Sequence, residues 1–303
     1  MNAPDGLVVV DKPGGMTSHD VVARIRRLAG TRRVGHAGTL DPMATGVLVI
    51  GVGKATRMLG YLTLADKEYT ATIRLGQSTS TDDAEGEVIS AVAAGEVCEA
   101  DIAAAAAALT GDILQVPPAV SAVKVGGRRA YRLARSGTAP RLAPRPVTVR
   151  EFVTSAPRRA GDMLDVDVTV RCSSGTYVRA LARDLGAALG TGGHLTRLRR
   201  TRVGGYRISS ARTLEQLAGE FDVLPLAQAA AAAFPRRDLT PDEARRLANG
   251  GRLATARTSP HDDQCHGSQL TAAGPVAAYA PDGTLVALVA EESGQARPLV
   301  VFA

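Results

Sequence analysis

The spacing of hydrophobic and polar positions predicts strands and helices that follow one another without a regular repeat. Residues 7–10 and 47–50 are continuous apolar runs, which are typical of buried strands. In residues 69–75 and 164–170, apolar side chains occupy alternate positions, as expected of strands with one buried face. We expect these segments to build the core of the fold.

Helices are predicted between these strands. One begins after Thr17 or Ser18, either of which can cap it, because apolar residues then recur at helical spacing. A second is predicted to follow a cap at Ser174, and an alanine-rich third covers residues 102–109. Residues 77–87 are polar and acidic and are predicted to form a loop. Because no strand-helix-strand unit repeats, the pattern favours a mixed α+β domain over a doubly wound one.

The C-terminal part of the chain has a different pattern, with short elements throughout. Residues 239–251 are predicted to form a helix with a threonine cap and a glycine stop. Residues 276–279 and 285–290 are predicted strands joined by a tight turn. Since 303 residues exceed the usual size of one domain, we expect two domains, at residues 1–235 and 236–303.

Composition is that of a globular protein, with 45% hydrophobic and 22% charged residues. No apolar run approaches the roughly 18 residues that a membrane span needs, and the first residues lack the pattern of a secretory signal. We therefore expect a cytoplasmic protein with no membrane partner. Cys98, Cys172 and Cys265 are too few and too scattered for a disulfide framework. His261 and His266 lie near Cys265, but no second ligand pair at zinc-finger spacing accompanies them, so we expect no metal.

The net charge of +6 and a pI near 9.5 favour a polyanionic partner, because clustered cations gain affinity by releasing counterions from phosphates. The positive charge is concentrated in two runs, although such runs often form solvated faces. These runs comprise Arg24, Arg26, Arg27, Arg32 and Arg33, and Arg197, Arg199, Arg200 and Arg202.

The sequence GVGKAT, residues 51–56, resembles a phosphate-binding loop but fails both standard patterns. A Walker loop needs glycine at the position of Leu48 and serine or threonine at the position of Ala55. A dinucleotide fingerprint needs glycine at the position of Thr56. We therefore exclude both types of nucleotide loop.

Asp41 stands in a glycine-rich segment, GHAGTLDPMATG, directly before the apolar run 47–50. A glycoside hydrolase needs two facing carboxylates, but no second acid follows until Asp66. A carboxylate mounted rigidly beside a buried strand suits an ion pair or a nucleophile. An isolated Asp-Pro more often closes a turn, so the residues alone leave this alternative open.

Five blocks of the sequence, in order, resemble the motifs of the TruB family of tRNA pseudouridine synthases. GHAGTLDPMATGVLVIGVGKATR, residues 35–57, is similar to the catalytic motif of that family. Residues 8–22 resemble its N-terminal motif, residues 67–87 its tyrosine motif, residues 115–137 its central block, and residues 172–200 the motif that supplies an arginine. The resemblance implies the pseudouridine synthase fold, a mainly antiparallel mixed sheet flanked by helices, with a small β-rich C-terminal domain similar to the RNA-binding PUA domain.

The resemblance also implies roles for individual residues. Asp41 matches the catalytic aspartate, Tyr69 the tyrosine that stacks on the target base, and Arg179 the arginine that pairs with the aspartate. His36 matches the histidine that fills the space left by the extruded base. Leu198 matches an apolar residue beside the active site.

Three further residues are assigned to substrate binding on the same resemblance. Lys12 stands where the family has a side chain that supports the active-site region. Tyr177 and Arg200 lie in the arginine motif, and we expect them to contact substrate. Ordinary structural roles remain the alternative, with Tyr69 as an inward strand residue, Leu198 as a core residue and Lys12 as a turn residue.

The implied reaction isomerises a uridine in the T loop of tRNA (position 55) to pseudouridine. A uridine inside a folded loop must be flipped out, which requires an aromatic surface and a filler for the gap. Because the reaction needs no redox change and no external group, no cofactor is expected. Asp41 can attack the sugar or promote a glycal-like intermediate, and the sequence leaves both routes open. The resemblance implies tRNA as partner, through its T arm, and a monomer.

Two other classes of function stay open on the sequence. One is a binding module or tRNA-folding chaperone, and chaperoning can also accompany catalysis. The other is an enzyme acting on a small glycoside or nucleotide, which the failed phosphate loops and the missing second acid disfavour.

Overall fold

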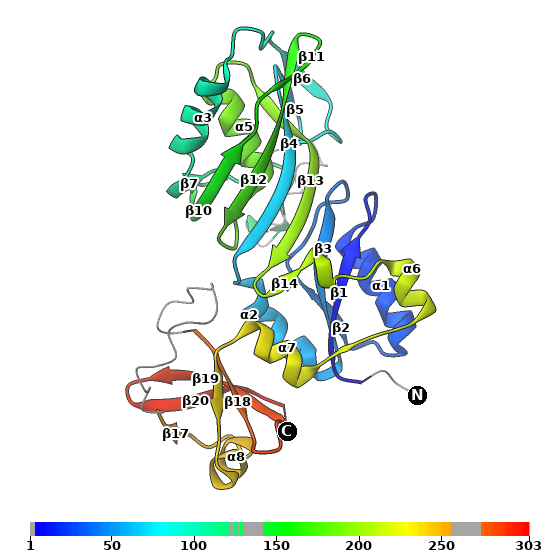
Figure 1. Cartoon of the computed structure of the whole chain (residues 1–303), viewed down its shortest axis with the longest axis vertical. Helices are drawn as coiled ribbons and strands as arrows, with labels where there is room; N and C mark the ends of the chain where they lie inside the picture. The colour runs from blue at the N-terminus through cyan, green and yellow to red at the C-terminus, as the bar shows by residue number, and fades with distance from the viewer. Residues whose placement is uncertain (1–3, 122–123, 126–127, 130–141, 256–273, 303) are drawn as a thin grey trace. The chain divides into compact units, whose positions relative to one another are not determined.

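The computed structural model describes residues 4–121, 124–125, 128–129, 142–255 and 274–302 (Figure 1). The chain forms two compact units: one contains residues 1–41, 46–65 and 203–303, and the other contains residues 42–45 and 66–202. Each unit combines helices with a sheet, so the expected mixed α+β class is confirmed. None of the described helices is long and apolar enough to cross a membrane.

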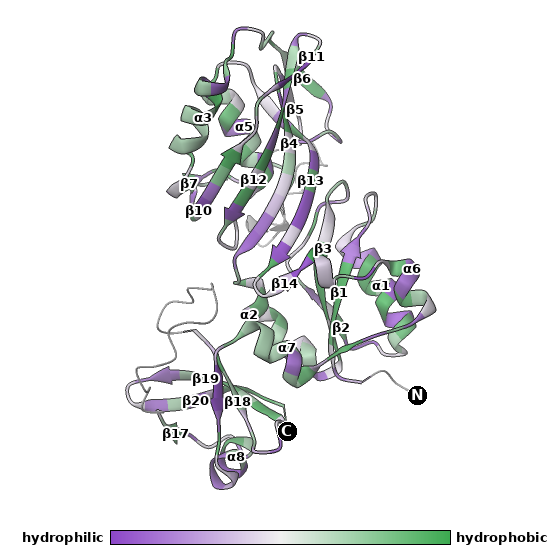
Figure 2. Cartoon of the chain, viewed as in Figure 1, coloured by the Kyte–Doolittle hydropathy of each residue, from purple (hydrophilic) through white to green (hydrophobic). Residues whose placement is uncertain are grey.

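The first unit begins with strand β1 (Gly6–Lys12), which leads into helix α1 (Ser18–Ala29). β1 is hydrophobic along most of its length (Figure 2). Thr17 caps α1: its hydroxyl accepts a hydrogen bond from the Asp20 amide, and the Asp20 carboxylate accepts one from the Thr17 amide. Gly30 ends the helix in the left-handed conformation, with φ of 63°. The predicted start of the helix is confirmed. It could be predicted because Thr17 and Asp20 are close together in the sequence.

The sheet of the first unit contains three further strands near β1. They are β2 (Val34–Ala37), β3 (Thr45–Val52) and β15 (Leu224–Pro225). β3 and β15 pair antiparallel with β1, and β2 pairs antiparallel with β3. The buried sides of β1 and β3 share one hydrophobic core with three short helices, η1 (Gly53–Met58), α2 (Leu59–Thr63) and α7 (Leu226–Ala233). The GVGKAT sequence therefore leads from a strand into a 3₁₀ turn.

The C-terminal part of the first unit is a five-stranded sheet with one helix (Figure 1). The strands follow the order β16 (Arg236–Asp238), β18 (Val276–Tyr279), β19 (Leu285–Glu292), β20 (Gln295–Val301) and β17 (Leu253–Ala254). Helix α8 (Pro241–Ala248) is capped by Thr240, as predicted. This confirms a β-rich C-terminal part. Tyr279 and Phe302 extend into the same core as β1 and β3, so residues on both sides of position 235 pack together.

Between β3 and this C-terminal part, the first unit also contains three short elements. They are β14 (Tyr206–Arg207), η2 (Ile208–Ser210) and α6 (Leu214–Gly219). α6 packs against α1 and is capped by Thr213.

The second unit is built on long antiparallel strands. β4 (Lys67–Leu75) pairs with β12 (Met163–Cys172), β12 with β10 (Arg145–Thr154), and β10 with β7 (Gly111–Gln115). β13 (Gly193–Val203) lies on the other side of β4. Helices α3 (Glu99–Ala108) and α5 (Val178–Ala188) cover one face of this sheet (Figure 1). Shorter strands complete the unit: β5 (Gln77–Thr79), β6 (Val88–Ala91), β8 (Lys124–Val125), β9 (Arg128–Arg129) and β11 (Arg158–Ala160).

Two sequence predictions need correction in this unit. The predicted cap at Ser174 is wrong, because α5 begins after Tyr177 and has no side-chain cap. Its start is fixed instead by Gln115 of β7: the Gln115 amide donates to the Tyr177 carbonyl at 3.1 Å, and the Tyr177 amide donates to Gln115 Oε1 at 2.8 Å. The loop predicted over residues 77–87 begins with strand β5, which pairs with β6 immediately after the loop.

Candidate active site

Asp41 follows a residue whose backbone is held on both sides. The Ser18 hydroxyl, at the start of α1, accepts a hydrogen bond from the Leu40 amide at 2.9 Å and donates one to the Leu40 carbonyl at 3.1 Å. Leu40 itself is buried, and Asp41 is half-buried. Because its neighbour is fixed, the Asp41 carboxylate projects from a stable segment of backbone, as a nucleophile requires.

Lys12 stabilises the turn that precedes α1. Its side chain is fully buried, and its ammonium donates to the carbonyls of Pro13 at 2.9 Å and Met16 at 2.7 Å. The turn leads directly into Ser18, which holds Leu40. Lys12 therefore fixes the backbone of the turn that leads into α1.

His36 lies in β2, opposite Ile50 of β3, and is half-buried. Its ring meets that of His19 edge to face, with centroids 5.6 Å apart and an interplanar angle of 80°. No pattern in the sequence indicates that His19 is a neighbour of His36. The edge-to-face contact fixes the orientation of the His36 ring.

Tyr69 lies in β4, opposite Val170 of β12, and its side chain is buried. Two residues earlier, on the same face of the strand, Lys67 is only 6% exposed. Burial, with a smaller contribution from the nearby positive charge of Arg200, lowers the pKa of Lys67 to about 8. Arg200 is itself 1% exposed, so two buried cations, Lys67 and Arg200, lie near one another. The sequence did not identify Lys67 as a site residue.

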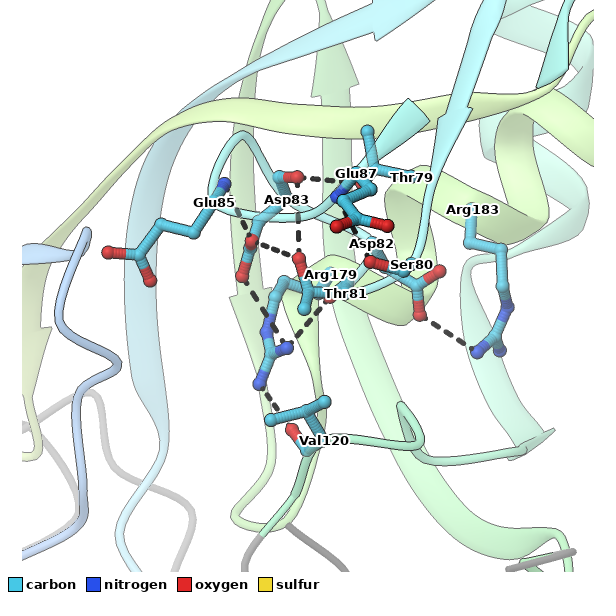
Figure 3. Close-up of polar contacts among 10 residues, drawn as sticks. All are labelled: Thr79, Ser80, Thr81, Asp82, Asp83, Glu85, Glu87, Val120, Arg179 and Arg183. Carbon is cyan, nitrogen blue, oxygen red and sulfur yellow. Dashed lines mark hydrogen bonds and ion pairs between the residues drawn. The ribbon is translucent and has the colours of Figure 1, made fainter. Parts of the chain in front are cut away.

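Arg179, in the first turn of α5, is held by three acceptors (Figure 3). Its guanidinium donates to the carbonyls of Thr81 at 2.8 Å and Val120 at 2.9 Å, and lies 3.5 Å from the Asp83 carboxylate. The two side chains of this ion pair are only 4% and 3% exposed. Asp83 is fixed in turn by the Thr81 hydroxyl and the Glu85 amide.

One turn later on α5, Arg183 makes a similar set of contacts, with one backbone carbonyl and with Asp82, the residue before Asp83. Arg183 Nη1 lies 3.2 Å from Asp82 Oδ2 (Figure 3). Arg183 Nη2 donates to the Val116 carbonyl at 2.8 Å. Asp82 has the left-handed backbone conformation, with φ of 60°. Burial raises the pKa of Asp82, against the opposite effect of Arg183. Two consecutive aspartates thus link the acidic loop to α5.

Tyr177 and Leu198 also belong to the second unit. Tyr177 immediately precedes α5 and is fixed through its backbone by Gln115. Leu198, on β13, is buried, and its carbonyl accepts a long hydrogen bond of 3.5 Å from the Thr45 hydroxyl.

The predicted site residues divide between the two units. Those of the first unit are Lys12, His36 and Asp41, and those of the second are Tyr69, Tyr177, Arg179, Leu198 and Arg200. The Arg179–Asp83 ion pair was not foreseen. The feature of the sequence that could have indicated it is the pair of adjacent acids in TSTDDAEG, which lies in the same block as Tyr69.

The candidate metal cluster of His261, Cys265 and His266 lies outside the described residues. Within the described ranges, no three His, Cys, Asp or Glu side chains gather as a metal site would require. Cys98 and Cys172 are free thiols.

Solved structures of similar fold include chains of two complexes. The chain is similar to one in a Cbf5-Nop10-Gar1 complex, with a TM-score of 0.71 and 27% identity, covering 98% of this chain and 84% of that one. It is equally similar, at 25% identity, to a chain of an H/ACA RNP bound to a substrate RNA containing 2′-deoxyuridine, covering 98% and 85%. The expected pseudouridine synthase fold is confirmed.

Family models account for most of the chain. The TruB family pseudouridylate synthase N-terminal domain matches residues 26–178, the tRNA pseudouridylate synthase B C-terminal domain matches residues 179–226, and the tRNA pseudouridine synthase II C-terminal model matches residues 234–303. Fold and sequence together define a pseudouridylate synthase, an isomerase.

The chain belongs to the TruB family. It is 62% identical over 300 residues to the tRNA pseudouridine synthase B of Arthrobacter sp. (strain FB24), covering 98% of this chain and 96% of the relative. It is 60% identical over 303 residues to that of Thermobifida fusca (strain YX), covering 99% of both chains. The family resemblance seen in the sequence is thus confirmed.

Proposed function

We propose that this protein isomerises a uridine in the T loop of tRNA to pseudouridine. The observation that carries the proposal is the identity of about 60%, over nearly the whole chain, with relatives named tRNA pseudouridine synthase B. We further propose that the protein acts in the cytoplasm, as a monomer, on the T arm of tRNA. The reaction needs no cofactor, since it neither oxidises the nucleotide nor adds a group to it.

The first step is extrusion of the uridine from its loop. Losing the stacked position costs a few kcal/mol, which contacts to the flipped base must offset. Tyr69 offers an aromatic face for the uracil, and His36, held by His19, fills the vacated space in the loop. Leu198, buried on β13, supplies an apolar contact near the nucleotide.

The chemical step exchanges one glycosidic bond for another. The N1–C1′ bond breaks, the uracil turns while still enclosed, and C5 bonds to C1′. C5 then loses its hydrogen as a proton, and N1 gains one, so atoms and electrons balance without an external reagent. In this route the Asp41 carboxylate bonds to C1′ as the N1–C1′ bond breaks, and it is released when C5 bonds to C1′; its fixed backbone is suited to this role. A glycal-like intermediate remains the alternative route.

Arg179 holds the Asp41 carboxylate ionised and oriented in this proposal. The fork of a guanidinium can serve several acceptors at once, and Arg179 already bonds two carbonyls and Asp83. These contacts fix the guanidinium before substrate arrives, so little reorganisation is needed during the reaction.

The remaining site residues have supporting roles. Lys12 fixes the turn before α1, while Tyr177 and Arg200 contact the RNA near the extruded nucleotide. We further propose that the chain is divided functionally into a catalytic domain, residues 1–235, and a PUA-like RNA-binding domain, residues 236–303.

Release of tritium from tRNA transcripts carrying 5-tritiated uridine tests the proposal. Because C5 loses its hydrogen only when it becomes the new attachment point, we expect about one tritium released per tRNA. A transcript with cytidine in place of the T-loop target uridine is the matched control and should release none. Release from the control would exclude the T-loop assignment. Binding of tRNA with no release would leave an RNA-binding protein or chaperone, and absence of both would favour a small-molecule substrate.

A further inference from the structure

Four exposed arginines lie at the C-terminal end of α1 and just after it. They are Arg24, Arg27, Arg32 and Arg33, here called the α1 arginine patch. In the part of the chain that the structure describes, none of them forms an ion pair with a carboxylate. The patch is therefore four exposed positive charges with no carboxylate of the described residues within ion-pair distance.

Many other arginines of the protein are neutralised locally. Examples are Arg74, Arg150, Arg158, Arg183, Arg202 and Arg237, each within 4.0 Å of a carboxylate. Arg26, inside the same segment as the patch, donates to the Val34 carbonyl. Hydrogen bonds from its own backbone and from Thr213 lower the pKa of Glu215, and the positive charge of Arg24 adds to this effect, so Arg24 has one acid in its vicinity, although not within ion-pair distance. The four arginines of the patch thus differ from these six ion-paired arginines.

Local stability does not explain this concentration of charge. Arg27 lies in the last turn of α1, where a cation interacts favourably with the helix dipole. Arg24, however, stands three residues before Arg27, and like charges at this spacing destabilise a helix. Arg32 and Arg33 follow the helix, beyond the Gly30 cap. An external polyanion would neutralise all four.

The position of the patch relative to Asp41 indicates which polyanion would bind it. α1 begins at Ser18, which bonds directly to Leu40, the residue before Asp41. At about 1.5 Å per residue, Arg27 lies roughly 14 Å further along the helix axis. A nucleic-acid duplex carries a phosphate charge about every 1.7 Å of its axis, so this distance falls within one stem.

We propose that the α1 arginine patch binds the phosphates of the stem whose loop carries the target uridine. This inference rests on the proposed function, because it needs a nucleotide bound at Asp41. It assigns α1 two tasks: its first turn holds the Asp41 segment, and its last turn and the residues after it grip the backbone of the same RNA arm.

The test measures the binding of two RNA probes at several salt concentrations. The probes are a full-length tRNA transcript and an isolated T-arm stem-loop. The patch variant is R24Q/R27Q/R32Q/R33Q, and the control variant is R74Q/R150Q/R158Q/R212Q, which removes the same number of charges from ion-paired positions. A second variant, R32Q/R33Q, changes only residues outside the helix and guards against loss of helix stability. Circular dichroism verifies that each variant is folded.

Each phosphate contact contributes about 0.7 to 0.9 to the slope of log affinity against log salt concentration. We expect the patch variant to lose about three units of slope and, at 0.15 M salt, on the order of 100-fold in affinity. R32Q/R33Q should lose about half of that slope. Both probes should be affected equally, and the control variant should keep the wild-type slope.

Three outcomes overturn the inference. An unchanged slope in the patch variant excludes phosphate contacts, and an equal loss in the control variant attributes the effect to net charge. A loss confined to full-length tRNA places the contact on another arm. Tritium release by the wild-type protein is measured in parallel, so failure of the patch inference is distinguishable from failure of the proposed function.

Discussion

Asp83→Asn tests whether the buried ion pair holds Arg179 in place. The substitution removes the charge 3.5 Å from Arg179 Nη1 but keeps the size of the side chain. Since the two partners are only 4% and 3% exposed, water cannot take over the role of the carboxylate. Removing one partner of a buried ion pair typically costs about 3–5 kcal/mol.

The structure places this case at the lower end of that range. The carbonyls of Thr81 and Val120 continue to accept hydrogen bonds from the guanidinium, and the asparagine oxygen can still accept from the Thr81 hydroxyl or the Glu85 amide. We therefore expect a loss of about 3 kcal/mol in the free energy of unfolding. A shift of Arg179 by about 1 Å should also lower turnover by on the order of 100-fold.

Urea unfolding and single-turnover tritium release measure the two effects. Asp82→Asn is the matched control, because the Arg183–Asp82 pair has side chains that are 28% and 16% exposed. A partly exposed pair of this kind should contribute about 1 kcal/mol or less. Equal losses in Asp82→Asn and Asp83→Asn, or an Asp83→Asn protein as stable and active as the wild type, would refute the reasoning.

Three further substitutions probe neighbouring parts of the site. Because the pKa of Lys67 is lowered from 10.5 to about 8, its burial costs stability below pH 8, and the cost disappears as the pH rises to 10.5. Lys67→Met should therefore be more stable than the wild type at pH 7, by up to about 3 kcal/mol, and this advantage should shrink between pH 8 and 10.5 in urea unfolding. A difference in stability that does not change with pH would contradict the lowered pKa of Lys67. Ser18→Ala leaves both backbone groups of Leu40 without their partner, so we expect a loss of about 1–3 kcal/mol and a fall in kcat larger than the change in KM; an unchanged kcat contradicts the role of the Asp41 segment. Arg179→Lys cannot reproduce the planar fork and should lose most activity in the tritium assay, whereas near wild-type turnover contradicts the proposed pairing.

Much of the fold was predictable from local signals. Thr17 and Asp20 lie three residues apart and cap α1 by themselves, and Thr240 caps α8 in the same way. The strand alternation around Tyr69 reflects one buried face, which a sequence shows directly. In each of these cases the structure depends on residues that are close together in the sequence, so the sequence pattern is enough to predict it.

The errors concern contacts between distant residues. The start of α5 depends on Gln115, 62 residues before Tyr177, so Ser174 was a misleading signal. Arg179 bonds the Thr81 carbonyl across 98 residues, and no periodicity in the sequence indicates that contact. The short strand β16 was missed because it forms only by parallel pairing with β18, some 40 residues later. Pairing at such separations is decided by the tertiary fold.

In the proposed function, uridine isomerisation on tRNA requires the Asp41 carboxylate. Tritium release under single-turnover conditions, compared between the wild type and Asp41→Asn, tests this requirement most directly. We expect release of about one tritium per tRNA by the wild type and none by the variant, with both binding tRNA to a similar extent. Release by Asp41→Asn at the wild-type rate would show that the reaction does not need this carboxylate.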